Sequence, residues 1–176
     1  MIRLATKEDL NEICDLFASI KKELAMENNP QWGASIEQYP YLDEYFIDYP
    51  NRQIIEEDIN NKELYMYEED KIIKGIITIC KDNGEYEDIV ETSNKKSIII
   101  HRLAIPENYR KLGLAQKLIS YAENKAKEDK ISIIKADTEV SNVKMNNLFN
   151  KLGFKVKGNF SYDDYPGKYI YYEKEI

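Results

Sequence analysis

The stretch from Ile98 to Ala126 constrains the fold of this 176-residue chain more than any other part of it. An apolar run from Ile98 to Ile105 is typical of a buried β-strand, and Pro106 ends it. A short basic segment containing Gly113 comes next, and apolar residues then recur at helical spacing. This pattern predicts a strand, a tight turn and a helix in direct succession, as in an α/β fold.

The start of that predicted helix has the chemistry of an anion-binding site. The first backbone N–H groups of a helix have no intrahelical partner, and the helix dipole adds positive potential there. Arg110 and Lys111 add two full charges, and Gly113 lets the backbone approach a ligand closely. A phosphate or pyrophosphate fits such a site. The glycine could equally serve only tight packing, so the residues alone leave both interpretations open.

Two motifs, in order along the chain, resemble those of the GNAT superfamily of N-acetyltransferases over about residues 98–160. Arg110-x-x-Gly113-x-Ala115 is similar to the family's acetyl-CoA signature, Gln or Arg, two residues, Gly, one residue, Gly or Ala. A family helix motif is matched further on, by Asn142-x-x-Met145-x-x-Leu148-Phe149-x-x-x-Gly153-Phe154. The first third of the chain matches the family only in general layout.

The resemblance implies an enzyme that transfers an acetyl group from acetyl-CoA to a primary amine of a small molecule or peptide, by direct attack in a ternary complex. It implies that the motif strand pairs with the pantetheine arm, that the turn holds the pyrophosphate through backbone N–H groups, and that Asn142 also binds the arm. Asn142 is a good helix N-cap residue as well, and both roles can coexist. The implied cofactor-binding residues are Leu103, Ala104, Ile105, Arg110, Lys111, Leu112, Gly113, Leu114, Ala115 and Asn142.

The remaining patterns predict a single domain over residues 1–176, of the α/β class with a mixed sheet. Strands are expected at about 2–5, 64–67, 72–80, 98–105, 131–136, 154–160 and 168–176. Helices are expected at about 7–26, at 52–60, from the signature to 128, and around 145–152. This order is also that of the GNAT fold, which implies about seven mostly antiparallel strands, splayed at the centre, with helices on both faces and the thioester in the gap.

Phe149 departs from the family pattern. Many members have tyrosine at this position, and its phenol protonates the leaving thiolate, which phenylalanine cannot do. Tyr162 and Tyr165, in the last predicted turn, are candidates for the missing acid. The ordinary thiol pKa of about 8.5 also makes unassisted departure plausible. A second interpretation follows, in which the fold is a non-catalytic module that binds and senses acyl-CoA.

His101 is the only histidine of the chain and the first candidate for a general base. Imidazole exchanges protons near neutral pH, and this residue lies on the motif strand at the mouth of the implied gap. The alternative is an ordinary sheet histidine whose ring is packed and hydrogen-bonded. Asp88 and Glu91, which precede the motif strand, are further candidates.

The segment of residues 28–50 combines many aromatic residues with three prolines, which is unusual for a loop in a compact domain. In the GNAT family this region borders the acceptor, so Trp32 and Tyr39 are candidate substrate-binding residues. Aromatic rings could bind an apolar or cationic substrate. They could equally fill the core.

Composition narrows the range of partners. The formal net charge of -7 argues against binding to nucleic acid or to an anionic membrane, and it is compatible with a cationic amine substrate. Cys14 and Cys80 form no metal-binding or disulfide pattern, so no metal is expected. The N-terminus lacks a signal-peptide core, and no apolar run approaches membrane-spanning length, which favours a cytoplasmic protein. Monomer and homodimer both stay open.

Overall fold

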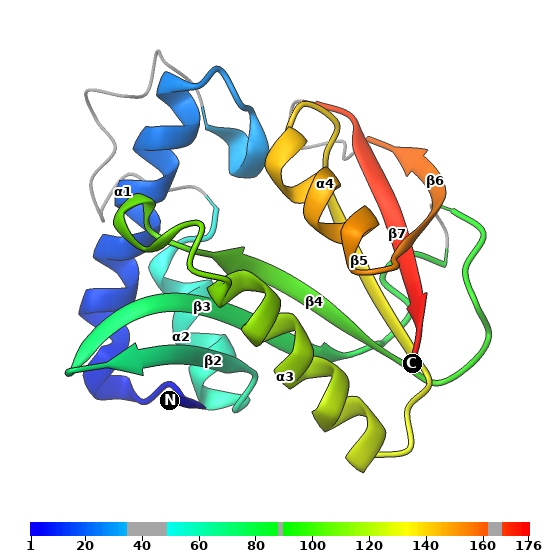
Figure 1. Cartoon of the computed structure of the whole chain (residues 1–176), viewed down its shortest axis with the longest axis horizontal. Helices are drawn as coiled ribbons and strands as arrows, with labels where there is room; N and C mark the ends of the chain where they lie inside the picture. The colour runs from blue at the N-terminus through cyan, green and yellow to red at the C-terminus, as the bar shows by residue number, and fades with distance from the viewer. Residues whose placement is uncertain (35–48, 88–89, 162–166) are drawn as a thin grey trace.

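The computed structural model describes residues 1–34, 49–87, 90–161 and 167–176. Seven strands form one sheet in the order β1-β2-β3-β4-β5-β7-β6 (Figure 1). The strands are β1 (Ile2–Leu4), β2 (Leu64–Glu69), β3 (Ile72–Lys81), β4 (Ser97–Ala104), β5 (Ile133–Glu139), β6 (Lys155–Phe160) and β7 (Tyr169–Glu175). The α-helices are α1 (Leu10–Met26), α2 (Arg52–Asn60), α3 (Leu114–Glu128) and α4 (Val143–Lys151). The 3₁₀ turns used below are η1 (Lys7–Asp9), η2 (Gln31–Gly33) and η4 (Glu107–Tyr109). The predicted element order and fold class are confirmed.

The largest difference from the predicted boundaries is at β5. The apolar run predicted a strand over 131–136, whereas β5 runs from Ile133 to Glu139. Ile131 instead closes the turn that follows α3, because its N–H donates to the Ala126 carbonyl. The polar residues at the other end continue the strand because they pair with β7, up to Glu139 opposite Tyr169. Hydrophobic periodicity could not show this extension, since it depends on pairing with a distant strand.

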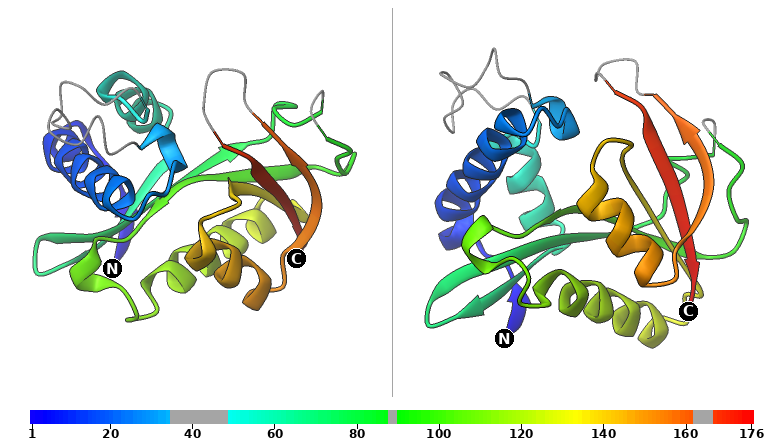
Figure 2. Two further views of the ribbon diagram at one scale, coloured as in Figure 1. Left: turned by 90° about the horizontal axis from the view of Figure 1, so that it is seen from above. Right: turned by 45° about the horizontal axis from the view of Figure 1, so that its top comes forward.

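The helices cover the sheet from both sides, as predicted. α1 and α2 lie on one face, and α3 and α4 lie on the other (Figure 2). The core between α1, α2 and the first strands includes Phe17, Ile55, Met66 and Ile76. The core under α3 and α4 includes Leu118, Ile134, Phe149 and Tyr172. Two separate apolar cores therefore lie on the two faces of the sheet.

The sheet divides between β4 and β5. The two strands pair in parallel from Ser97 opposite Ile133 to Ile100 opposite Ala136. Beyond Ile100, β4 pairs only with β3 and β5 pairs only with β7. The strands consequently diverge towards the top of Figure 1. The predicted splayed centre is confirmed, and each strand has an inner edge without a strand neighbour.

A β-bulge bends β4 just where the divergence starts. Thr78 of β3 lies opposite His101, but Ile76 lies opposite Ala104, so that two residues of β4 face one residue of β3. Arg102 lies in the bulge with a φ of 50°, which is uncommon for a residue with a side chain. Bulges of this kind redirect side chains and increase the local twist. Here the bulge directs the last part of β4 along the gap.

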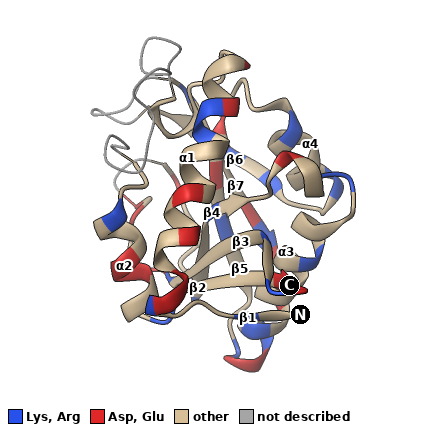
Figure 3. Ribbon diagram, turned by 90° about the vertical axis from the view of Figure 1, so that its left-hand side faces the viewer, with Lys and Arg blue, Asp and Glu red and all other residues tan. Residues whose placement is uncertain are grey.

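Charged residues are spread over the helices and strands of the molecule (Figure 3). In the described part of the chain, no helix combines the length and the apolar character needed to cross a membrane. The two cysteines differ in their surroundings, since Cys14 is buried and Cys80 is partly exposed. Burial raises the pKa of the Cys80 thiol to about 12, so this thiol is not a reactive thiolate at neutral pH.

An ion pair at the N-terminus makes stability depend on pH. Arg3 donates to both carboxylate oxygens of Asp9, at 2.9 and 2.8 Å, and the Thr6 N–H donates to one of them. The hydrogen bond from Arg3, followed by those from Thr6, lowers the pKa of Asp9 to about 2, although burial opposes the change. Because this pKa lies below its value in the unfolded chain, the stabilisation is present above about pH 4 and is lost as the pH falls towards 2.

We expect Asp9→Asn to lower the free energy of unfolding by roughly 1–2 kcal/mol at pH 7, and by progressively less below pH 4. Urea unfolding of both forms between pH 7 and pH 2.5 measures this difference. Glu8→Gln, at the exposed neighbouring position, serves as the control and should change little. A difference that stays constant down to pH 2.5 would contradict the assignment.

Candidate functional site

A cavity of about 830 Å³ lies where β4 and β5 diverge. Its walls come from the end of α1 and η2, from β4, from β5 and from the start of α4. A volume of this size suits a small-molecule or cofactor site. Nine of the residues that the sequence predicts for binding or catalysis line it, namely Trp32, His101, Leu103, Ala104, Ile105, Arg110, Lys111, Ala115 and Asn142.

The inner edge of β4 forms one long wall of this cavity. Leu103, Ala104 and Ile105 line it in succession, beyond the last residue of β4 that pairs with β5. An extended ligand with amide groups can pair with such a strand edge as a peptide does in strand addition. The splayed sheet thus creates the edge that the resemblance to the GNAT family implies for the pantetheine arm.

The start of α3 lies at one end of the cavity. Gly113 is the N-cap, with a φ of 75°, and the first intrahelical bond runs from the Lys117 N–H to its carbonyl. The N–H groups of the first helical turn are therefore left for another acceptor. A Cβ atom at Gly113 would meet no atom within 4 Å. Packing therefore does not require this glycine, whereas the left-handed backbone favours it, and the open space would let a ligand approach closely.

The side chain of Arg110 is engaged within the protein, whereas the sequence predicts that it adds a full charge to the anion site. Its Nε donates to the Ile105 carbonyl at 3.0 Å, and its Nη2 forms an ion pair with Glu23 of α1. Because a carboxylate already compensates the guanidinium, Arg110 offers less charge to an anion than the sequence alone indicates, and its part in anion binding stays a prediction. Its side chain instead fastens the turn to α1 and β4. Lys111 is exposed, and among the residues described it is the charge nearest to Gly113 in sequence.

Asn142 is buried and occupies the N-cap of α4. Its Oδ1 accepts a hydrogen bond from the Met145 N–H at 3.3 Å, so the predicted capping role is confirmed. The cap uses the amide oxygen and leaves the Nδ2 donors for a ligand carbonyl. The binding role of Asn142 stays a prediction that this geometry permits.

A buried polar cluster adjoins the cavity, which Arg102 and Tyr49 of this cluster line. Arg102 donates through Nε and Nη2 to the two carboxylate oxygens of Asp58, at 2.8 and 2.7 Å. Its Nη1 donates to the Tyr49 hydroxyl at 2.7 Å, and Thr78 donates to Asp58 at 3.0 Å. The side chains of Arg102 and Asp58 are only 9% and 8% exposed. Burial raises the pKa of Tyr49 although Arg102 opposes it, so this phenol is neutral at physiological pH.

His101 lies beside this cluster and close to a carboxylate that the sequence did not single out. Its Nε2 is 3.2 Å from Oε2 of Glu85, and both residues line the cavity. Burial would raise the pKa of Glu85, but the hydrogen bond and charge of His101 outweigh it, and the pKa is lowered. Of the two predicted alternatives, Glu91 lines a separate groove near β6 and β7, and Asp88 lies outside the described residues.

Gln31 joins the two halves of the divided sheet. Its Oε1 accepts hydrogen bonds from the Thr138 hydroxyl at 2.9 Å and from the Glu139 N–H at 2.8 Å. Both partners belong to β5, whereas Gln31 follows α1. No sequence signal could have identified this bridge, since Gln31 and Thr138 are 107 residues apart.

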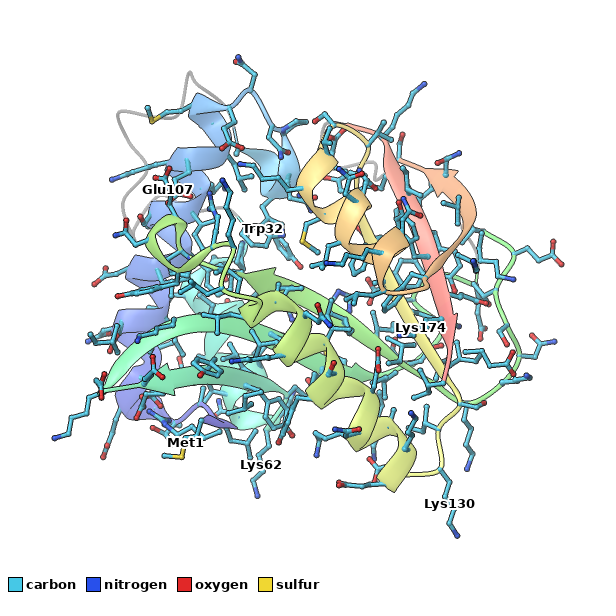
Figure 4. The ribbon with its side chains drawn as sticks, viewed as in Figure 1. Met1, Trp32, Lys62, Glu107, Lys130 and Lys174 are labelled. Carbon is cyan, nitrogen blue, oxygen red and sulfur yellow. The ribbon has the colours of Figure 1, made fainter. Side chains whose placement is uncertain are left out.

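Trp32 packs in the core and also lines the cavity, and its substrate-binding role stays a prediction. Its ring packs edge-on against Phe17 with the centroids 5.4 Å apart, and it also lines the cavity. In Figure 4, Trp32 is labelled near the centre of the molecule, and Glu107 is labelled to its left. The other aromatic candidates, Tyr39, Tyr162 and Tyr165, lie outside the described residues.

Phe149 borders the cavity from the side of α4. Its side chain is 2% exposed and packs against Phe154 and Tyr172, with ring centroids 4.9 and 5.2 Å away. The Tyr172 hydroxyl donates to Asn146 and is therefore engaged elsewhere. The ring at position 149 thus borders the cavity but carries no acidic proton.

Comparison with known proteins agrees with this geometry. The sequence profile described as "Acetyltransferase (GNAT) family" matches residues 22–154, well over half of the chain. The fold is similar to a GNAT-family acetyltransferase from Listeria monocytogenes, with a TM-score of 0.74, 22% identity, and coverage of 100% of this chain and 94% of that one. A GNAT-family acetyltransferase from Streptococcus agalactiae has a TM-score of 0.71 and 26% identity, covering 100% and 95%. PaiA N-acetyltransferase from Thermoplasma acidophilum, solved in complex with coenzyme A, has a TM-score of 0.72 and 17% identity, covering 100% and 98%. The chain therefore belongs to the GNAT family of N-acetyltransferases.

Proposed function

We propose that this protein transfers the acetyl group of acetyl-CoA to a primary amine of a small molecule or peptide, by direct attack in a ternary complex. The observation that carries the proposal is the cavity at the divergence of β4 and β5. Ala115 at the start of α3 and the side chains of Glu85, His101 and Arg102 all line this cavity. In this proposal, one cavity combines an anion site with a proton-exchanging site.

The cofactor half extends from the start of α3 along β4. Backbone N–H groups between Gly113 and Ala115 bind the pyrophosphate, and Lys111 adds a charge. The backbone of Leu103–Ile105 pairs with the pantetheine arm, and the Asn142 amide donates to it from the facing helix. This placement rests on the left-handed Gly113, on the strand edge beyond Ile100, and on the orientation of the Asn142 cap.

The acceptor half lies beyond the bulge. A backbone N–H near Leu103 stabilises the negative charge that develops on the thioester oxygen. The amine nitrogen forms a bond to the acetyl carbon, and the carbon–sulfur bond breaks with its electron pair on sulfur. One proton of the amine ends on the thiolate, and a further proton from an ammonium form passes to a base and then to solvent. His101 is the proposed base because it lines the cavity at the divergence point.

The identity of the proton donor to sulfur is a separate part of the proposal. Phe149 cannot serve, and Tyr162 and Tyr165 are the sequence-based candidates. A thiolate with a pKa of about 8.5 also leaves without a dedicated acid. The phenylalanine at this position is the observation in favour of the second function, a module that binds acyl-CoA without transferring it.

We expect 1 mM acetyl-CoA to raise the melting temperature. If the dissociation constant is about 10 μM, mass action adds about 2.7 kcal/mol to the free energy of unfolding. For a chain of this length that corresponds to a shift of about 5–10 °C. Thermal melts with acetyl-CoA, and with pantetheine as a control that lacks the pyrophosphate, measure it. Equal shifts from both ligands would count against the anion site at α3.

Turnover decides between the two functions. The assay follows free thiol released from acetyl-CoA in the presence of primary amines, including alkyl diamines, amino acid amides, short peptides and aminoglycosides. Thiol release above the amine-free rate, with the acetylated amine identified by mass spectrometry, supports the transferase. A clear melting shift without release from any amine supports the acyl-CoA-binding module instead.

A further inference from the structure

We propose that Glu85 is a positioning residue, which orients His101 and fixes its tautomer so that Nδ1 accepts the proton of the acceptor amine. This inference rests on the proposed function. Nε2 of His101 is 3.2 Å from Oε2 of Glu85, and the two side chains are 13% and 37% exposed. They come from different elements, β4 and the loop after β3, and they meet on the wall of the cavity.

The loop that carries Glu85 is anchored on both sides of this residue. On one side, Asp82 forms an ion pair with Lys135 of β5 at 2.5 Å and accepts a hydrogen bond from Ser97, also at 2.5 Å. Lys135 is only 1% exposed, so its charge strongly requires this partner. On the other side, the Tyr86 hydroxyl donates to Asp137 at 2.5 Å. These anchors connect the loop to β4 and β5 and hold the Glu85 carboxylate in place beside the imidazole.

The chemistry of the pair determines which nitrogen is the base. The pKa of Glu85 is lowered, so its side chain is a carboxylate at neutral pH and can only accept hydrogen bonds. It therefore favours the imidazole tautomer with the proton on Nε2, which leaves the lone pair on Nδ1. In the described residues, no hydrogen bond to Nδ1 is found. Other enzymes use the same arrangement, in which a carboxylate orients a histidine that acts as the base for a nucleophile.

Glu85 also affects the energy of the proton transfer from the amine to His101. When Nδ1 takes a proton from the amine, His101 becomes an imidazolium, and the adjacent carboxylate stabilises the new positive charge. The proton leaves later to solvent or to the thiolate, which restores the neutral imidazole. A histidine that is merely packed and hydrogen-bonded in the sheet could show the same dependence of its tautomer on Glu85, but Glu85 would then have no effect on turnover.

The single histidine of the chain makes the test direct. With ¹⁵N-labelled imidazole, long-range ¹H–¹⁵N spectra identify the tautomer of His101 without interference. We expect the Nε2–H form to predominate in the wild type at a pH where the ring is neutral, and a mixture of both tautomers in Glu85→Gln. Glu87→Gln changes an exposed glutamate two residues along the same loop and should leave the spectrum as in the wild type.

Kinetics on an amine that the wild type acetylates complete the test. We expect Glu85→Gln to lower kcat at least about tenfold and Glu85→Asp to recover part of it. The KM for acetyl-CoA and the melting shift with acetyl-CoA should stay unchanged, which shows that the fold and the cofactor half are intact. An unchanged tautomer, or a changed tautomer with an unchanged kcat, overturns the proposal. If the wild type acetylates no amine, the proposed function fails and the role of His101 as a base fails with it, whereas the spectra still report on the pair itself.

Discussion

Gly113→Glu is expected to weaken acetyl-CoA binding by about a hundredfold or more. Gly113 caps α3, and the free N–H groups of the first turn are the proposed contact for the pyrophosphate. A carboxylate a few ångströms from that group adds a repulsion of several kcal/mol at an effective dielectric constant of about 20. Each 1.4 kcal/mol corresponds to about a tenfold loss of affinity, so most measurable binding disappears. Isothermal titration with acetyl-CoA measures the effect.

Gly113→Gln is the matched control for this experiment. Both variants place a side chain of the same size at a φ of 75°, where a residue other than glycine costs about 1 kcal/mol. No atom lies within 4 Å of the added Cβ, so neither variant creates a clash within the protein. The two variants should therefore melt at similar temperatures. We expect the Gln variant to lose much less affinity than the Glu variant. Equal affinities in the two variants would show that the pyrophosphate does not lie near position 113.

Asp58→Ala is expected to produce the largest loss of stability. The Asp58 carboxylate is the partner of two guanidinium nitrogens of Arg102 and of the Thr78 hydroxyl, in a region that is almost completely buried. Removing one member of a buried ion pair leaves an uncompensated charge and typically costs about 3–5 kcal/mol. For a chain of this size the melting temperature should fall by about 10 °C. Chemical unfolding and thermal melts measure both quantities.

Two further variants distinguish the loss of the Asp58–Arg102 ion pair from a general disruption of α2. Glu57→Ala lies on the exposed side of the same helix and should change the free energy of unfolding by less than about 0.5 kcal/mol. In the Asp58→Ala background, Arg102→Met removes the unpaired charge and should recover part of the lost stability. A single Asp58→Ala variant within 1 kcal/mol of the wild type would mean that Arg102 finds another partner or water, and that the cluster is less rigid than its geometry indicates.

The cofactor half could be predicted from the sequence because its residues are neighbours in the chain. A strand, a turn with one glycine and the first turn of a helix all lie between Ile98 and Ala115, and their geometry is set by local backbone preferences. Even here, the charge that Arg110 can offer to a ligand depends on the fold. The charge of Arg110 is compensated by Glu23 from α1, which is 87 residues away in the chain.

The acceptor half could not be predicted because its residues meet only after the sheet has formed. Arg102 and Asp58 are 44 residues apart, and their contact requires the bulge opposite Ile77 as well as the packing of α2 on the sheet. Glu85 reaches His101 because Asp82 and Tyr86 anchor the loop to β5. His101 was a candidate because of its residue type and its place on the motif strand, but no local pattern pointed to Asp58, Arg102 or Glu85 as its surroundings.

The sequence by itself determined the element order, through hydrophobic periodicity and capping, and it indicated the family, through two motifs that resemble those of GNAT members. Only the tertiary structure decided where β4 and β5 separate, which side chains face the gap and which charges compensate each other. The physical reason is that strand register and a single bulge control these contacts, and a shift of one residue along a strand moves every side chain to the opposite face.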